Sequence, residues 1–368
     1  MVSRPPAPDD MTGLTVVLGV VAGAALSWWL TGVVRRYAIA RALLDIPNPR
    51  SSHTTPTPRG GGLAIAGVAL TGVALAGAMD PSSRATAIAL GGGGLLVAWV
   101  GWLDDRRGLS AGSRVLVQVV AAAWALYWLG GLPSLTVGDW TITLGPWGSI
   151  LGAVGIVWCT NLYNFMDGVD GIAAGEAVSV AGIGTVLLWL SGNQGLSLMA
   201  ATVGAASAGF LWWNWSPARI FMGDVGSGTL GFLFAGLAVA SENAGAVPLA
   251  AWLLLLGAFI FDATATLLRR VLRVERWYQA HQRHAYQRAV QAGLSHARVS
   301  GAVLLLNAGL GLLAAAVWAR PDRLLVCLVA ASLLLGAVYW LIERIRPMNG
   351  ESTAPDAGAA GRPGAPNG

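Results

Sequence analysis

The stretch RATAIALGGGGLLVAWVGWLDDRRG (Arg84–Gly108) joins a long apolar run to a charged end, and this combination recurs along the chain. Residues 84–102 are almost wholly apolar, and about 20 such residues are enough for a helix to cross a bilayer. Asp104 and Asp105 follow at once, beside two arginines. Because a charge at mid-bilayer costs about 2.5–3.5 kcal/mol on insertion scales, the stretch predicts a membrane helix whose acidic end lies in water or in a binding site.

Similar apolar segments fill most of the 368 residues, which are 55% hydrophobic and only 11% charged. We therefore predict an all-α fold, a polytopic membrane helix bundle with about 11 transmembrane helices. We expect a single transmembrane catalytic domain over residues 12–346, with disordered tails at 1–11 and 347–368, where proline, glycine and alanine prevail. The predicted spans are 12–34, 61–79, 84–102, 114–130, 147–163, 172–190, 196–213, 228–241, 246–268, 299–319 and 323–343.

The basic residues indicate the orientation of this bundle. All 23 are arginines, because the chain has no lysine. With the N-terminus outside, the outer segments hold only Arg4, Arg84, Arg320 and Arg323. The other arginines then lie on the inner side, as the positive-inside rule requires. The N-terminus is predicted outside, and the C-terminus and the acidic loops in the cytoplasm.

Acidic side chains gather in the loops at that inner end. Besides Asp104 and Asp105, they include Asp167 and Asp170 in a D-G-V-D-G turn and Asp224 after Met-Gly. Two carboxylates about 4 Å apart repel by roughly 4 kcal/mol at an effective dielectric constant near 20. Five converging acids would therefore either become partly protonated or hold a divalent cation. Oxygen-only ligands favour Mg²⁺.

The last long inner loop, Arg269–Arg298, interleaves arginines with aromatic residues, a composition typical of a helix lying on an anionic leaflet. His281 and His284 are three residues apart and would share a helix face. With no acid between them, we predict that they are cationic partners for phosphate rather than metal ligands.

Other polar residues allow two interpretations each. His53 lies among turn-forming prolines and is equally consistent with a structural role. Phe221 either offers an aromatic face to a base or anchors the chain at the interface. Asp262, inside the ninth span, needs a polar neighbour and either braces the fold or contacts the substrate. His296 has no companion motif and is predicted to be a loop residue.

Taken together and in order, six motifs resemble the polyprenyl-phosphate N-acetylhexosamine-1-phosphate transferases (glycosyltransferase family 4), with the final loop closest to the O-antigen-initiating branch. They are DIPNPRSSHTTPTPRGGGLAI, GWLDDRRG, NLYNFMDGVDGIAAG, FMGDVGSGTLGF, FIFDATATLLRR and AHQRHAYQ. The resemblance implies that a UDP-N-acetylhexosamine gives its sugar 1-phosphate to undecaprenyl phosphate, which yields a lipid-diphosphate sugar and UMP. It also implies Mg²⁺, with Mn²⁺ as a substitute, and a multi-pass protein of the bacterial cytoplasmic membrane with its active site on the cytoplasmic face.

The resemblance assigns catalytic roles by matching motif. Asp224 would be the principal Mg²⁺ ligand. Asp104 would be the base or a carboxylate that positions the acceptor, with Asp105 beside it. His281 and His284 would meet the diphosphate or the sugar. Because the second pKa of a phosphate monoester is about 6, the acceptor is already largely dianionic, so we expect Asp104 to position more than to deprotonate and favour direct attack by the lipid phosphate over a two-step route.

The substrate-binding residues follow in the same way. Asp170 would hydrogen-bond the uracil and Phe221 would stack on it. Asn164 and Asp167 would shape the nucleotide pocket. The resemblance further places three residues of the first inner loop with the substrates: His53, Thr57 and Arg59. Of these, Thr57 and Arg59 would lie near the lipid phosphate.

Two alternatives are weighed against this interpretation. Phospho-N-acetylmuramoyl-pentapeptide transferases share most of the motifs but carry consecutive histidines in the last inner loop, which here reads AHQRHAYQRAV. A transporter would place its charged site near the bilayer midplane between repeated halves, whereas here the acids lie at one end and no repeat is visible.

No nucleic-acid partner is expected, and a homodimer is left open. No motif distinguishes N-acetylglucosamine from N-acetylfucosamine or N-acetylquinovosamine, or identifies the downstream polymer.

Overall fold

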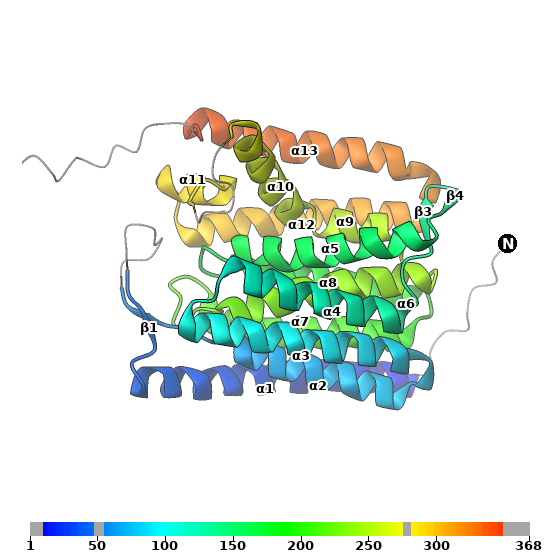
Figure 1. The fold of residues 1–368 in the computed structure, drawn as a ribbon, viewed down its shortest axis with the longest axis horizontal. Coiled ribbons are helices and arrows are strands. Elements are labelled where there is room, and N and C mark those ends of the chain that lie inside the picture. The colour runs from blue at the N-terminus through cyan, green and yellow to red at the C-terminus, as the bar shows by residue number, and fades with distance from the viewer. Residues whose placement is uncertain (1–9, 48–54, 275–280, 349–368) are drawn as a thin grey trace, which may run out of the picture.

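The computed structural model describes residues 10–47, 55–274 and 281–348, and most of its helices run side by side along one long axis (Figure 1). The helices are α1 (Asp10–Ala40), α2 (Gly62–Met79), α3 (Arg84–Arg107), α4 (Ala111–Leu129), α5 (Pro146–Phe165), α6 (Ile172–Leu190), α7 (Gln194–Asn214), α8 (Asp224–Asn243), α9 (Leu249–Leu255), α10 (Gly257–Leu272), α11 (Ala285–Gln291), α12 (His296–Ala319) and α13 (Leu324–Ile345).

Within the described residues, nine helices are long and apolar enough to cross a membrane, or up to ten if the bent pair of α9 and α10 counts as one span. The remaining predicted span, 147–163, coincides with α5, which is 20 residues long but outside that group. The prediction of an all-α, multi-pass membrane protein is thus confirmed, with nine or ten spans by this test where eleven were predicted.

The ninth predicted span, 246–268, is not one straight helix. It is broken into α9 and α10, which meet at an angle of 79°. Helix kinks often occur at glycine, and here Gly257 follows the break, where an added Cβ would lie 3.3 Å from the side chain of Leu310 on α12. The bend turns α10 across the direction of its neighbours (Figure 1).

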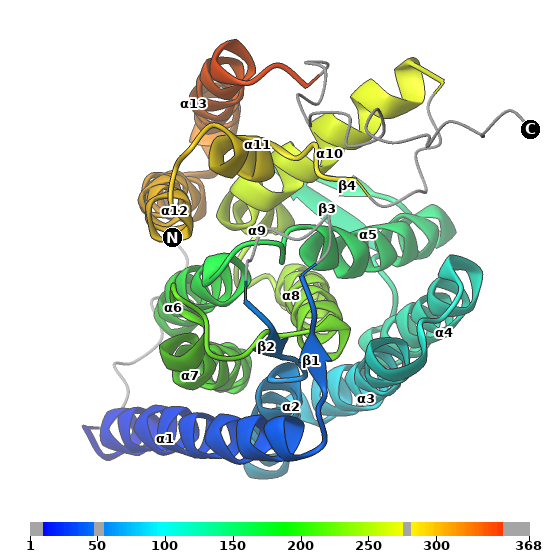
Figure 2. The ribbon, with the colours of Figure 1, turned by 90° about the vertical axis from the view of Figure 1, so that its left-hand side faces the viewer.

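Helix α8 lies at the centre of the bundle, as the end-on view shows (Figure 2), and nearly all of its residues are buried. Small residues allow other helices to approach it closely. An added Cβ on Gly62 of α2 would lie 2.4 Å from the Cα atom of Gly226, and one on Gly231 would lie 2.4 Å from the carbonyl oxygen of Cys159 on α5. The contact between Gly62 and Gly226 brings the loop before α2 against the start of α8.

Two short antiparallel hairpins, which were not predicted, lie at opposite ends of the bundle (Figure 1). At one end β1 (Leu44–Asp45) pairs with β2 (Thr57–Pro58). At the other end β3 (Ser134–Val137) pairs with β4 (Trp140–Thr143).

The predicted tails fall mostly outside the described residues. Helix α1 begins at Asp10, two residues inside the N-terminal tail that was predicted. At the other end Met348 is 5% exposed and its N–H donates to Glu343 Oε1 at 3.2 Å. The described part of the chain therefore extends two residues into the predicted C-terminal tail.

Candidate active site

Arg59 follows β2 and lies beside the residues that precede α8. The N–H of Phe221 donates to the carbonyl oxygen of Pro58 at 2.8 Å, and the N–H of Gly61 donates to that of Phe221 at 2.9 Å. This backbone pairing directs Arg59 toward the acids. Its Nη2 lies 2.8 Å from Asp105 Oδ1 and 3.1 Å from Asp224 Oδ1.

Asp105 joins the end of α3 to the start of α8. Its carboxylate accepts the backbone N–H groups of Asp224, at 2.9 Å, and Val225, at 3.2 Å. A carboxylate at a helix N-terminus satisfies free N–H groups and interacts favourably with the helix dipole. Gly223 just before has φ of +77°, and an added Cβ would lie 2.6 Å from Asp105. Glycine is therefore required for this close contact.

Arg114, in the first turn of α4, reaches the same acids from the other side. Its Nη1 lies 2.8 Å from Asp104 Oδ2 and 3.3 Å from Asp224 Oδ2. Asp104 also accepts the backbone N–H of Leu109, which holds the α3–α4 turn. Asp224 thus lies between two arginines, Arg59 and Arg114, whose side chains are 39% and 34% exposed.

Asp167, in the turn after α5, adds another acid to this neighbourhood. Burial raises the pKa of Asp167 well above its usual value, and the negative charge of Asp224 raises it further, while Arg59 opposes the shift. We call Asp104, Asp105, Asp167 and Asp224 the carboxylate cluster. Its acids outnumber the two arginines that contact it.

This surplus of acid bears on the predicted magnesium ion. In the described part of the chain, no three histidine, cysteine, aspartate or glutamate side chains are arranged to hold a metal ion. Arginines instead contact oxygens of Asp104, Asp105 and Asp224. The donor set still fits a hard divalent cation, because it consists of carboxyl oxygens and contains more acids than arginines. Magnesium binding at Asp224 therefore stays a prediction.

Asp170 occupies the same turn as Asp167 but has its own partners. Its Oδ2 accepts the N–H of Ala218 at 3.1 Å and lies 3.2 Å from His296 Nδ1. Burial alone would raise the pKa of Asp170, but the hydrogen bond and charge of His296 and the N–H of Ala218 hold it below its usual value. His296 is the first residue of α12, so the prediction of a loop position was wrong.

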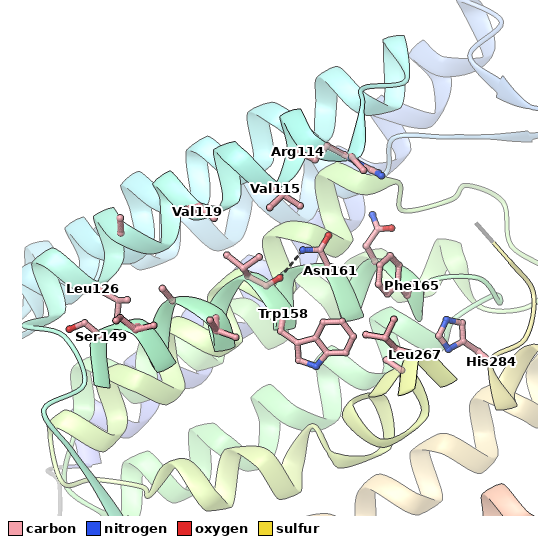
Figure 3. A pocket seen from close by; sticks show the side chains of 18 of the residues that line it. Arg114, Val115, Val119, Leu126, Ser149, Trp158, Asn161, Phe165, Leu267 and His284 are labelled. Carbon is pink, nitrogen blue, oxygen red and sulfur yellow. Dashed lines mark hydrogen bonds between the residues drawn. The ribbon is translucent and has the colours of Figure 1, made fainter. Parts of the chain in front are cut away.

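A groove with a volume of about 1080 Å³ runs along α4 and α5 (Figure 3), and it is connected to the carboxylate cluster through Arg114. Arg114 lines one end, and Leu126 lines it twelve residues further along α4. At 1.5 Å per residue this is about 18 Å, more than half of a hydrocarbon core of about 30 Å. Most of the lining between them is apolar, including Val119, Val154 and Trp158.

The polar end of the groove holds three of the predicted site residues. His281 and His284 both line it, with ring centroids 4.8 Å apart. Asn164 lines it as well, and its Nδ2 lies 3.3 Å from the hydroxyl oxygen of Ser227, in the first turn of α8. The groove, the histidines and the start of α8 therefore meet at one place.

The three predicted residues of the first inner loop have different surroundings. Arg59 lies between the acids, as described above. Thr57 is 4% exposed, and its hydroxyl donates to the carbonyl oxygen of Thr55 at 3.0 Å, within its own loop. Phe221 is partly exposed beside Arg59. His53 lies outside the described residues.

Sequence reasoning missed Arg114, which it counted only as one inner positive charge. It also missed Asn161, which lines the groove and donates through Nδ2 to Gln118 Oε1 at 2.6 Å. Both are polar residues in apolar helices, and Arg114 follows Asp104 by ten residues. A polar residue within a predicted span near its inner end is the signal that could have identified them.

Comparison with known proteins shows the family. A profile of glycosyl transferase family 4 matches residues 87–242, which run from α3 to α8. A Bacillus subtilis protein named a probable undecaprenyl-phosphate N-acetylglucosaminyl 1-phosphate transferase is 32% identical over 306 residues, covering 81% of this chain and 83% of that protein. A decaprenyl-phosphate N-acetylglucosaminephosphotransferase of Mycobacterium tuberculosis is 31% identical, covering 79% of each chain. A phospho-N-acetylmuramoyl-pentapeptide-transferase of Picosynechococcus is 28% identical, covering 62% of this chain and 65% of that protein.

Proposed function

Because the chain belongs to glycosyl transferase family 4, we propose that it transfers N-acetylhexosamine 1-phosphate from a UDP-sugar to undecaprenyl phosphate. The products are undecaprenyl-diphosphate-sugar and UMP. The reaction takes place at the cytoplasmic face of the bacterial inner membrane, as the first membrane step in the synthesis of a polysaccharide such as O-antigen or a cell-wall polymer.

One observation carries this proposal: Arg114 belongs both to the apolar groove and to the carboxylate cluster. A polyprenyl chain needs an apolar path within the bilayer, and its phosphate needs a cation where that path ends. The groove along α4 and α5 offers the apolar path, and Arg114 offers the cation. Arginine suits phosphate because its planar guanidinium can donate two parallel hydrogen bonds.

The chemistry follows from this arrangement. An oxygen of the lipid phosphate attacks the phosphorus that carries the sugar, and the bond from that phosphorus to the bridging oxygen breaks. UMP leaves, and the bond between the sugar and its phosphate is retained. Phosphoryl transfer depends mainly on alignment and on neutralising charge. Arg114 orients the acceptor phosphate, Asp104 fixes Arg114, and Arg59, beside Asp105 and Asp224, supplies a second positive charge near the lipid phosphate.

The magnesium ion forms part of the proposal through Asp224, the acid that both arginines contact. When bound, a divalent cation neutralises phosphate charge. The surplus of acid over arginine in the carboxylate cluster supports this assignment. Asn164 lines the groove, and Asp167 stays the second proposed residue of the nucleotide pocket, with Asp170 and Phe221 as the proposed uracil contacts.

The test uses purified chain in detergent with undecaprenyl phosphate, Mg²⁺ and a panel of UDP-sugars, and measures release of UMP. UDP-N-acetylglucosamine comes first, since it matches the names of two relatives. We expect Mg²⁺-dependent release that is absent in the Asp224→Ala variant. Proton-coupled solute uptake without any UMP release would instead favour a transporter.

The alternative is phospho-N-acetylmuramoyl-pentapeptide transfer, since relatives with that name also match. The separated histidines at 281 and 284 and the lower coverage of those relatives favour the simpler sugar donor. Adding UDP-N-acetylmuramoyl-pentapeptide to the panel decides between them, because it would be the preferred donor if the alternative were correct.

A further inference from the structure

Asp262, on α10, is a buried carboxylate that the transfer chemistry above leaves unused. The residue is 7% exposed. Its Oδ1 accepts the N–H of Ala285 at 2.8 Å and the hydroxyl of Thr266 at 3.1 Å. Its Oδ2 accepts the N–H of Tyr286 at 3.1 Å. Two of these three donors belong to the start of α11, so the carboxylate ties α11 to α10.

The residue just before α11, His284, places its ring against the same carboxylate. Its Nδ1 lies 3.5 Å from Asp262 Oδ1 and is buried. The ring stacks on Phe165, with centroids 6.4 Å apart, and on Tyr286, at 5.8 Å. It is thus held with Nδ1 toward Asp262 while it borders the groove beside His281.

A carboxylate beside one ring nitrogen fixes which nitrogen carries the proton and stabilises the charged imidazolium. We propose that Asp262 is a positioning residue, which holds His284 so that its second ring nitrogen, Nε2, donates to a phosphate oxygen of the bound diphosphate. This inference rests on the proposed function, because the diphosphate is that of the donor. A carboxylate that only capped α11 would need to contact nothing more than the backbone N–H groups of that helix. The proposal gives Asp262 a second role, the orientation of His284.

The test is a double-mutant cycle on the full chain with UDP-N-acetylglucosamine and undecaprenyl phosphate. Asp262→Asn should lower kcat by about 30-fold, by analogy with carboxylates that orient metal-bound histidines, and change the donor KM by less than about threefold. His284→Gln should lower kcat at least as much. The double variant should be no slower than His284→Gln alone, whereas losses that multiply would overturn the proposal.

Two matched variants control for loosening of α11. Tyr286→Phe removes the hydroxyl that donates to the carbonyl oxygen of Phe165 at 2.9 Å, without touching the Asp–His contact. Thr266→Val removes the hydroxyl that donates to Asp262. Both should keep kcat near that of the unaltered chain. If Tyr286→Phe were as slow as Asp262→Asn, a loose loop would explain the loss and the proposal would fail.

A second measurement does not depend on turnover. The ¹⁵N chemical shifts of the His284 ring distinguish its two neutral tautomers and the imidazolium, and they should change in Asp262→Asn but not in Thr266→Val. Unchanged shifts in Asp262→Asn would overturn the proposal. If the unaltered chain released no UMP from any donor while the shifts changed, the proposed function would fail and the positioning of His284 by Asp262 would stand.

Discussion

Two groups of ion pairs lie toward the same end of the bundle and differ in their balance of charge. The carboxylate cluster has four acids, three of which contact two arginines that are each about a third exposed. In the second group, which we call the Glu343 clamp, one acid meets two arginines. Glu343 Oε2 lies 2.6 Å from both Arg269 Nη1 and Arg288 Nη1, and Arg288 is only 2% exposed.

The difference indicates that the carboxylate cluster is suited to binding a ligand, whereas the Glu343 clamp stabilises the fold. The clamp joins α10, α11 and α13, and Arg288 also donates to the carbonyl oxygen of Arg346 at 2.9 Å. Removing one partner of a buried pair destabilises a protein, because the other charge loses its counter-ion. In the cluster, by contrast, the spare acids leave a neighbour for each arginine when one acid is removed. Substitutions in the cluster should therefore affect activity, and substitutions in the clamp should affect stability.

The largest effect on activity is expected for Asp224→Asn. UMP release should fall by about 1000-fold, the upper end of what one electrostatic group at a transition state contributes. The melting temperature should stay within the error of the unaltered chain, because Arg59 keeps Asp105 and Arg114 keeps Asp104. Asp322→Asn, at the other end of the bundle, is the control. A large drop in melting temperature would mean that the cluster holds the fold as the clamp does.

Arg114→Ala should have the next largest effect. Truncating one partner of a hydrogen-bonded charge pair costs several kcal/mol, so we expect kcat/KM for undecaprenyl phosphate to fall by about 100-fold. Most of the loss should appear in the KM for the lipid. Arg107→Ala, which removes an exposed arginine at the end of α3, should leave that KM near its original value. An equal loss in both variants would indicate a general effect of positive charge on the membrane surface.

The contrast between cluster and clamp also marks what the sequence could predict. Long apolar runs predicted the helices, because hydrophobic length alone decides whether a helix can cross a bilayer. The acids of the cluster were predicted to gather because each lies close to the end of a predicted span on the inner side of the membrane. The 79° break before Gly257 was not predicted, because nothing in the apolar sequence of residues 246–268 distinguishes a bent helix from a straight one.

Pairings between distant residues account for the misses in the site. In the sequence, Arg114 at a helix end indicates only the orientation of the span in the membrane. In the structure, its guanidinium contacts Asp104 and Asp224. The partner of Asp170 is His296, 126 residues further along. A pattern in one sequence indicates which residue types gather at one face of the membrane, but it does not indicate which side chains contact one another there.

A smaller effect is expected for Val154→Trp, which fills the groove without changing any charge. Val154 lines the groove and is 61% exposed, so the larger side chain should be tolerated by the fold. We expect the KM for undecaprenyl phosphate to rise by about tenfold, with the KM for the UDP-sugar unchanged. Val186→Trp, on the exposed surface of α6 at 55% exposure, is the matched control. Equal effects of both would mean that the acceptor does not use this groove.

The smallest effect on activity is expected for Glu343→Gln, which tests the other half of the comparison. The substitution leaves Arg269 and Arg288 without their shared acid, and Arg288 is buried. The melting temperature in detergent should fall by several degrees, whereas activity per folded protein, measured well below it, should stay within about threefold.

The control for this variant is Arg344→Gln, which changes a neighbouring charge that lies over Trp340 rather than in the clamp. It should leave both the melting temperature and the activity unchanged, because an exposed charge contributes little to stability. A fall in kcat for Glu343→Gln at an unchanged melting temperature would show that the clamp contributes to catalysis. Its contact with α11 would be the route, since α11 begins next to His284.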